Sequence, residues 1–255
     1  MSLQACADIV RKGDPDRFSA AMAAPVAARR VLFPLYAFNV EVARAPWVAS
    51  EPMIGEMRLQ WWRDALEEIA KGGPVRKHEV TTPLAKALDR EAAEALDRLI
   101  EARRWDLYTD AFEDGAHFET YLSDTGGLLM QTAARLLGAG AETEIKVRAF
   151  GNGTALVKFL RAVPELESRG RIPLVDGRVD AVGDLGHAAA DALPSRSDLR
   201  RVLSGEAHAA LLEGWETRQL LRQISRQPDR VAAGRVGQSE FARRVSLLWA
   251  TTFGV

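Results

Sequence analysis

The sequence predicts an all-α protein with a single domain that spans residues 1–255. Apolar side chains recur along most of the chain at spacings that fit one face of a helix. Strand patterns are scarce, and the one short β-like run, 172–175, contains a proline. No internal repeat and no long linker divides the chain, so we expect helices that surround one shared core.

The first clear helix is expected over 54–69. Its predicted buried face carries Ile54, Met57, Trp61, Ala65 and Ile69. Gly72 and Gly73 follow it and end it. Within the helix Arg58 and Trp62 are four residues apart, so we expect the guanidinium to stack on the indole as a cation–π pair, worth about 0.5–1 kcal/mol.

Further apolar periodicities follow along the chain. They predict helices over 84–104, 118–137, 142–163, around 211–224 and around 241–249. Pro164 is expected to end the helix over 142–163, because proline lacks the amide hydrogen that a helix interior needs. The glycine-rich stretch 164–186 is then expected to form an irregular loop.

Two glycine motifs lie within helical patterns. Gly126 and Gly127 each cost about 1 kcal/mol relative to alanine in a helix, which indicates a kink or room for a bulky group. Two shorter helices separated by a loop are an equal alternative. Gly151-Asn152-Gly153 lacks the third glycine of a nucleotide-binding loop, since position 156 is leucine. Small residues here favour close packing against a neighbouring helix.

Composition limits the function classes. The chain has 34 basic and 35 acidic residues and a net charge of −1, so nothing calls for nucleic acid as a partner. The single cysteine, Cys6, excludes an internal disulfide and a zinc site made of cysteines. No apolar segment approaches the roughly 18–20 residues that would span a bilayer. We therefore expect no transmembrane segment and a soluble, cytoplasmic protein.

Metal-binding patterns are weak. No two of the four histidines are four residues apart, so no helical histidine pair can chelate zinc. Asp106 and Asp110 are four residues apart, and a helix would place both carboxylates on one face, where they suit Mg²⁺. One such pair is weak evidence for a metal site, so an exposed acidic face is the simpler interpretation.

Four segments, in this order, resemble the squalene/phytoene synthase superfamily from about residue 16 to residue 174. They are PVAARRVLFPLYAFN (25–39), RLQWWRD (58–64), the helix with Gly126-Gly127, and GNGTALVKFLRAVPELESRGRIPL (151–174). The resemblance implies an isoprenoid-synthase-type helical bundle around a central cleft. It also implies head-to-head condensation of two prenyl diphosphates, with Mg²⁺ held by aspartate motifs on two facing helices.

The sequence departs from that family pattern at both motifs. The acidic positions of the first motif fall on Ala43, Arg44 and Trp47. The two aspartates of the second motif fall on Ala162 and Leu166. A diphosphate leaving group needs its charge neutralised, so this double replacement indicates that metal-dependent condensation is lost. The alternative is an active prenyltransferase that binds Mg²⁺ through atypical ligands, for which the candidates are Glu41, Asp106 and Asp110.

Most basic positions of the family pattern are retained. The expected substrate-binding residues are Arg30, Tyr36, Arg58, Arg161, Arg169 and Arg171. Arginine forks suit phosphate oxygens. An equal alternative is that these arginines now pair with Glu41, Glu165 and Glu167 as a structural network.

A narrower resemblance lies within the superfamily. FNVEVA in place of the first motif, together with MRLQWWRDALEEI, is similar to a non-catalytic branch that includes a mitochondrial assembly factor of respiratory complex I. The resemblance implies a pseudoenzyme that needs no cofactor and binds a lipid, such as a prenyl diphosphate, or assists assembly with a protein partner. It also implies a place at the inner membrane, as a peripheral protein.

Overall fold

The computed structural model describes residues 2–49, 51–203 and 205–255, and within these ranges it contains helices and no strand. The α-helices are α1 Leu3–Gly13, α2 Pro15–Ala23, α3 Arg29–Val48, α4 Pro52–Lys71, α5 Thr81–Ala87, α6 Arg90–Arg103, α7 Gly115–Leu122, α8 Leu128–Leu136, α9 Glu144–Ser168, α10 Val179–Ala192, α11 Arg196–Val202, α12 Thr217–Arg226, α13 Asp229–Ala232 and α14 Glu240–Phe253. The other helical turns are η1 Arg104–Leu107, η2 Ser123–Gly127, η3 Ala141–Thr143 and η4 Gly205–Gly214. The predicted all-α class is confirmed.

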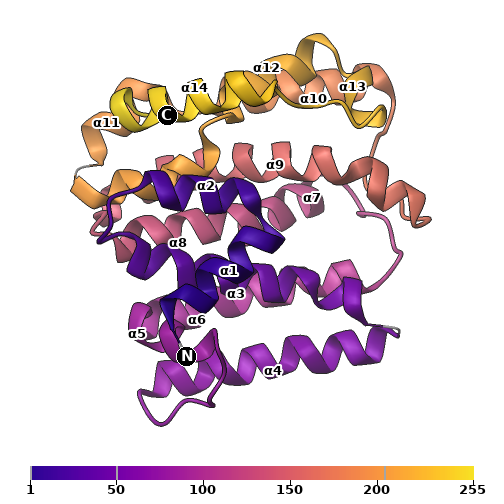
Figure 1. Cartoon of the computed structure of the whole chain (residues 1–255). Coiled ribbons are helices and arrows are strands. Elements are labelled where there is room, and N and C mark those ends of the chain that lie inside the picture. Colours follow the sequence, from indigo (N-terminus) through magenta and orange to yellow (C-terminus); the bar gives the residue numbers. More distant parts are fainter. Residues whose placement is uncertain (1, 50, 204) are drawn as a thin grey trace.

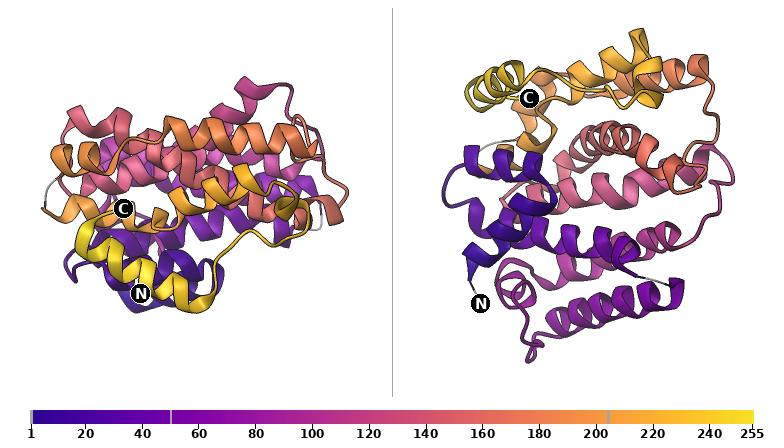
Figure 2. Two further views of the ribbon diagram at one scale, coloured as in Figure 1. Left: turned by 90° about the horizontal axis from the view of Figure 1, so that it is seen from above. Right: turned by 45° about the vertical axis from the view of Figure 1, so that its right-hand side comes forward.

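The helices lie side by side in stacked layers (Figure 1). At one end of the molecule lies α4, followed by α3 and α6, then α8 and α9, and a layer from α10 to α14 closes the other end. The turned views of Figure 2 show the same order. One apolar cluster joins α1, α3, α6, α8 and η4, and a second joins α7, α9, α10 and α12. Residues of α3 and α9 together line one cleft of the molecule.

Close packing of α9 against η2 depends on glycines. A methyl group at Gly151 would lie 2.9 Å from the Cα of Gly127, which no real contact allows. One at Gly127 would lie 2.0 Å from Oδ1 of Asn152. The predicted close packing at 151–153 is therefore confirmed. The Gly126-Gly127 pair lies in the π-helical turn η2, so α7 continues into α8 without a loop, and α9 occupies the space that the glycines leave.

The prediction that Pro164 ends the helix was wrong. Helix α9 continues through Pro164 to Ser168. Proline removes one backbone hydrogen bond, but Leu160, Val163 and Leu166 are all buried on the same helix. Burial of that apolar face compensates for the lost bond, since tertiary packing supplies most of the stability of a helix in a protein.

The predicted loop over 164–186 was also mostly wrong. Only 169–178 lies between helices, and α10 begins at Val179. Its buried face consists of Val182, Gly183 and Gly186, packed on α12. A methyl group at Gly186 would lie 2.9 Å from Cγ2 of Ile224. Two of the three buried residues are glycines, which give no apolar signal in the sequence.

Two predicted helices are divided and one has a different buried face. The segment 84–104 forms α5 and α6, with Asp89 capping the second through the amide of Ala92. The segment around 211–224 divides into η4 and α12. In α4 the indole of Trp62 is buried, whereas Met57 is 68% exposed and Trp61 only partly buried.

The predicted stack of Arg58 on Trp62 is not formed. Arg58 is exposed, and the Trp62 ring packs edge-on against Phe38 with 5.6 Å between centroids. The arginine that lies over a tryptophan here is Arg76, 5.0 Å from the centroid of Trp61. The buried face of α4 is rotated relative to the prediction. Trp62 is therefore the buried tryptophan, and Trp61 is the one that lies under an arginine.

Candidate ligand cleft

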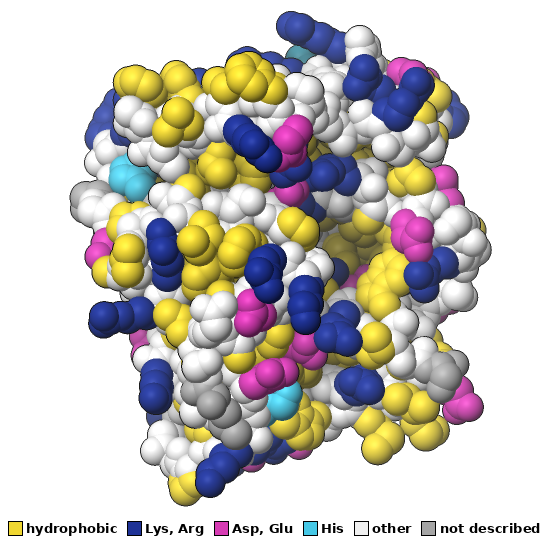
Figure 3. Space-filling view, viewed as in Figure 1, with side chains coloured by type: hydrophobic (Ala, Val, Ile, Leu, Met, Phe, Trp, Pro, Cys, Tyr) yellow, Lys and Arg dark blue, Asp and Glu magenta, His cyan; other side chains and the backbone are white. Residues whose placement is uncertain are grey.

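A cleft of about 780 Å³ opens between α3 and the start of the chain. It is lined by Ile9, Lys12, Gly13, Asp14, Arg17, Asn39, Val40, Glu41, Ala43, Arg44, Trp47, Glu79, Arg103 and Lys158. Figure 3 shows this face of the molecule hollowed right of centre, between the levels of α3 and α9, with basic and apolar side chains around the hollow. Five lining residues are cationic and three are acidic. The cleft therefore has a polar, moderately basic wall.

The α3 wall carries the positions of the first motif. Ala43, Arg44 and Trp47 all line the cleft, as the expected motif positions should. Arg44 pairs with Glu41 one turn earlier, at 3.0 Å between Nη1 and Oε1. On α9, Leu166 is buried and Ala162 is half-buried. The wall that would face a metal cluster thus offers a methyl group, a guanidinium and an indole.

A network of ion pairs forms the inner wall. Arg17 pairs with Glu213 at 2.5 Å and with Asp14 at 2.9 Å. Lys158 of α9 reaches Asp14 at 3.1 Å and Glu213 at 3.5 Å. Asp14 also caps α2 by accepting the amide of Arg17 at 2.9 Å. These pairs join α2, α9 and η4, so the network fixes the relative positions of the three elements.

The pKa values follow from this pairing. Burial alone would raise the pKa of the Asp14 carboxyl, but Lys158 and Arg17 hold it well below its usual range. Burial alone would lower the pKa of Arg17, but Glu213 and Asp14 raise it above the ordinary arginine value. Asp14 and Arg17 are therefore both charged near neutral pH. The inner wall is electrostatically matched within the chain itself.

Tyr36 lies beneath this network. Its side chain is fully buried, with the guanidinium carbon of Arg17 5.5 Å from the ring centroid. Burial raises the pKa of its hydroxyl well above the ordinary value, and Glu213 adds to the effect. Among the residues that the structure describes, neither Tyr36 Oη nor Glu213 Oε1 has a hydrogen-bond partner. The floor under Arg17 is polar, but protein covers it.

A second cluster joins Arg103, Asp106, Tyr121 and Arg171. Arg103 donates to the Tyr121 hydroxyl at 2.7 Å and to Asp106 at 3.0 Å, and the hydroxyl donates to Asp106 at 2.9 Å. Arg171 donates to the carbonyl oxygens of Asp106 and Trp105, and its guanidinium lies 4.1 Å from the Trp105 ring centroid. Arg171 therefore fastens the 169–178 connection onto η1.

The structure does not bring the six expected substrate-binding residues together. Arg30 and Arg58 are exposed on α3 and α4, and neither lines the cleft. Arg161 pairs with Asp16 at 2.8 Å. Arg169 pairs with Glu165 and lies 4.3 Å from the ring centroid of Trp47, at the rim of the cleft. Tyr36 and Arg171 have the contacts already described.

The structural-network alternative for the arginines is borne out in part. Arg169 pairs with Glu165, as that alternative expects. Arg161 instead uses Asp16, which also pairs with Arg243 of α14. Glu216 pairs with Arg243 at 3.2 Å. The network therefore draws on carboxylates of α2 and of the residue before α12, which lie far from the arginines in the sequence.

The alternative metal ligands do not converge. Asp106 lies in η1, whereas Asp110 is exposed in the connection to α7, so the predicted helical pair was wrong. Glu41 pairs with Arg44, and Asp106 is held by Arg103 and Tyr121. Within 2–49, 51–203 and 205–255, no group of three or more His, Cys, Asp or Glu is placed to hold a metal ion. The residues present do not fit a magnesium cluster.

Several cleft residues escaped the sequence analysis. Asp14, Arg17 and Glu213 form the inner wall, yet 196 residues separate Arg17 from Glu213 along the chain. The one local signal is Asp14 followed by Pro15, which is typical of a helix start. That pattern predicts a cap but not an ion pair across the fold.

The fold defines the class of protein. A crystal structure of a dehydrosqualene synthase matches with a TM-score of 0.79 over 98% of this chain and 95% of that chain, at 16% sequence identity. A squalene synthase from Alicyclobacillus acidocaldarius matches with a TM-score of 0.70 over 88% and 93% of the two chains, at 17% identity. The architecture is the isoprenoid-synthase-type helical fold.

The sequence defines the family. Residues 10–245 match the family model for squalene/phytoene synthase, and the chain belongs to that family. Curated relatives carry the name NADH dehydrogenase (ubiquinone) complex I, assembly factor 6: the rat protein is 30% identical over 170 residues and the human protein 28%. The match covers 66% of this chain and 51% of each relative, so the chain spans about half the length of the curated relatives it matches. The expected likeness to complex I assembly factors is confirmed.

The structure also bears on membrane topology. Within the described ranges, no helix is both long and apolar enough to cross a bilayer.

Proposed function

We propose that this chain does not carry out Mg²⁺-dependent head-to-head condensation of prenyl diphosphates and acts as an assembly factor. One observation carries the proposal: the α3 wall presents Ala43, Arg44 and Trp47 where the family places acidic ligands. Ionisation of an allylic diphosphate releases a leaving group of about two to three negative charges, which the enzyme must neutralise with metal ions. An arginine among the ligand positions repels Mg²⁺.

The internal ion pairs support an assembly role over a catalytic one. Lys158 and Arg17 are the basic groups of the inner wall, and both already pair with Asp14 and Glu213. A diphosphate would have to displace these carboxylates, at the cost of leaving a buried charge unpaired. The names of the curated relatives support the protein-assembly reading independently.

Lipid binding is the second candidate, and two exposed basic residues of the cleft, Lys12 and Arg44, favour it. Lys12 is exposed at the cleft, and no carboxylate of the described ranges pairs with it. Arg44 retains 54% of its side-chain exposure despite Glu41. A cleft of about 780 Å³ suits a prenyl diphosphate or another anionic lipid. In either role we place the protein in the cytoplasm, peripherally at the inner membrane, where a protein partner would meet it.

The first test is diphosphate release. The purified protein is incubated with farnesyl or geranylgeranyl diphosphate and Mg²⁺, beside an active dehydrosqualene synthase and a blank without protein. We expect release at the rate of the blank and no condensed hydrocarbon. Release well above the blank refutes the proposal and supports the prenyltransferase alternative, with ligands still to be found.

The second test separates lipid binding from assembly alone. Farnesyl diphosphate is titrated without metal into the wild type, into Lys12→Gln/Arg44→Gln, and into Lys77→Gln as a control. Lys77 is exposed on the connection after α4 and does not line the cleft. Lipid binding predicts that only the double variant loses affinity, by about tenfold or more. No binding to the wild type removes the lipid candidate and leaves assembly.

A further inference from the structure

The outward face of α14 is apolar, which reverses the usual pattern of a surface helix. Its large exposed side chains are Phe241, Val245, Leu248, Trp249 and Phe253, with exposures of 77%, 49%, 69%, 41% and 48%. At 100° per residue these five positions fall within one continuous stripe of the helix. Ala250 is the one residue of α14 that is buried. Figure 3 shows apolar side chains gathered at the upper left, where Figure 1 places α14.

The inner side of α14 is held by charge. Arg243 pairs with Asp16 of α2, and with Glu216 at 3.2 Å. Arg243 projects from the side of the helix opposite to Phe241 and Val245, by the same 100° rule. The helix is therefore fixed to the body by ion pairs, while its apolar stripe remains outside.

Arginines that lack acidic partners lie beside this stripe. They are Arg196 and Arg200 of α11 and Arg218 and Arg222 of α12, and none of them pairs with a carboxylate of the part of the chain that the structure describes. The Arg196 guanidinium lies 4.4 Å from the ring centroid of Trp249. Burial, with Arg196 and Arg222 nearby, lowers the pKa of Arg218 to about 10. The four guanidinium groups repel one another and favour an anion.

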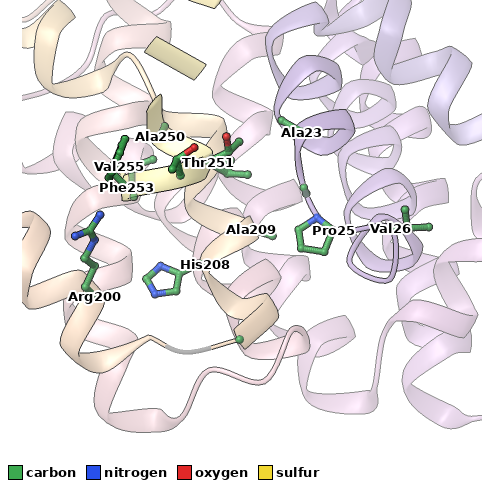
Figure 4. A pocket seen from close by; sticks show the side chains of 15 residues that line it. Ala23, Pro25, Val26, Arg200, His208, Ala209, Ala250, Thr251, Phe253 and Val255 are labelled. Carbon is green, nitrogen blue, oxygen red and sulfur yellow. The ribbon is translucent and has the colours of Figure 1, made fainter. Parts of the chain in front are cut away.

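One end of the arginine cluster opens on a pocket. The pocket measures about 880 Å³, and Arg200 and His208 are its basic side chains. Figure 4 shows these two on the same side, near Phe253 and Val255, while Pro25 and Val26 line the other side. Arg200 packs on the last turn of the chain, with its Nε 3.1 Å from the position a Cβ would take at Gly254. Basic groups and apolar surface thus meet at the end of α14.

We propose that α14 and this arginine cluster form a surface that docks on an anionic lipid bilayer. Interfacial helices pair an apolar face of Trp, Phe and Leu with basic residues that contact lipid phosphates. Residues 194–255 contain ten arginines, no lysine and six acidic residues, in a chain with a net charge of −1. Two of those acids, Glu213 and Glu216, are buried. The segment 194–255 is therefore basic, and arginine forks suit phosphate oxygens.

A second copy of the chain suits this surface less well. A twofold dimer would set the same patch of both copies face to face. The arginine clusters of the two copies would then approach each other, and like charges without anions between them destabilise such an interface. A bilayer that carries anionic lipid supplies both an apolar layer and phosphate. The inference deepens the membrane part of the proposed function and rests on that part alone.

Vesicle co-sedimentation tests the inference. The full chain is mixed with vesicles of phosphatidylcholine, or of phosphatidylcholine with 30% phosphatidylglycerol, at ~0.1 M salt. We expect binding to the anionic vesicles that weakens at high salt and is largely absent with phosphatidylcholine alone. Phe241→Ser/Leu248→Ser should weaken binding at least tenfold, and Arg196→Gln/Arg222→Gln about fivefold per arginine.

The matched control is a second exposed apolar surface. Met53→Ser/Met57→Ser changes side chains that are 72% and 68% exposed on α4, in the layer farthest from α14, and should leave binding unchanged. Circular dichroism confirms that each variant is folded. No binding by the wild type, equal loss in the α4 control, or unchanged binding in both α14-side variants overturns the inference. Diphosphate release by the wild type refutes the proposed function and leaves this result as it stands.

Discussion

The inner wall of the cleft and the surface beside α14 both carry basic side chains, but within the described ranges only those of the inner wall are paired with carboxylates. In the cleft, Arg17 and Lys158 lie between 2.5 and 3.5 Å from Asp14 and Glu213. Beside α14, Arg196 and Arg222 have neighbouring guanidinium groups and no carboxylate partner among the described residues. The first region is neutralised from within, and the second is open to an anion from outside.

This difference indicates that the charges of the cleft stabilise the fold, whereas the charges beside α14 are available for binding. Buried pairs that satisfy one another hold helices together, and removing one partner leaves an uncompensated charge. Exposed like charges store a small repulsion that a counter-ion relieves. We therefore expect stability to depend strongly on the cleft residues and hardly at all on the α14 side, whereas binding at a membrane should show the reverse.

The largest expected effect is that of Glu213→Gln. Glu213 has 4% exposure and is the partner of Arg17 at 2.5 Å. Glutamine keeps the shape but removes the charge, so Arg17 retains only Asp14. We expect the free energy of unfolding in urea to fall by about 3–5 kcal/mol.

The control for this change is Glu165→Gln. Glu165 pairs with Arg169 on the surface, where both side chains are more than half exposed. Its loss should cost no more than about 0.5 kcal/mol. If Glu213→Gln costs as little as this, the cleft network is not what joins α2, α9 and η4.

A second prediction tests whether the network is structural. The double variant Arg17→Met/Glu213→Leu replaces both partners of a buried pair with apolar side chains of similar length. Removing both charges should recover about 2–3 kcal/mol relative to the sum of the single variants. The four proteins of this cycle are compared by urea unfolding. Additive losses would contradict a direct interaction between Arg17 and Glu213.

The fold could be predicted from local patterns wherever apolar residues mark the buried face. The helices α9 and α14 were expected for that reason. Helix α10 was not, because two of its three buried residues are Gly183 and Gly186, which give no apolar signal. At Pro164 the sequence predicted a helix end that does not occur, since burial of α9 outweighs the hydrogen bond that proline removes.

The candidate site was predictable only where a family pattern marked it. The replaced motif positions Ala43, Arg44 and Trp47 do line the cleft. The inner wall was missed because 144 residues separate Asp14 from Lys158, and no spacing rule joins residues so far apart. The arginine cluster beside α14 was missed for the same reason, since α11 and α12 are brought together only by the fold.

A smaller effect concerns pH. Lys158 and Arg17 hold the pKa of the Asp14 carboxyl below its unfolded value. A carboxyl whose pKa is lower in the folded than in the unfolded protein adds stability at pH values above its unfolded pKa. This contribution is lost as the pH falls below about 4. Asp14→Asn keeps the cap of α2 but cannot titrate.

Urea unfolding from pH 6 to pH 2 measures this contribution. The variant should be less stable than the wild type at pH 6, by on the order of 1–2 kcal/mol, and the two curves should converge as the pH falls. A constant difference across the range would show that Asp14 contributes through shape or capping and not through its charge.

The smallest expected effect has the opposite sign, and it is the sharpest test of the comparison. Arg222 is exposed on α12, and its charge helps to lower the pKa values of Arg196 and Arg218. Arg222→Gln removes one of several like charges, so we expect the free energy of unfolding to rise by about 0.3–0.5 kcal/mol at low salt. The gain should vanish at about 0.5 M salt, where repulsion between exposed charges is screened.

Arg226→Gln, in the last turn of the same helix, removes a cation that favours the helix end and should give no gain. A loss of stability in Arg222→Gln at low salt would mean that the cluster is already neutralised within the chain, as the cleft is.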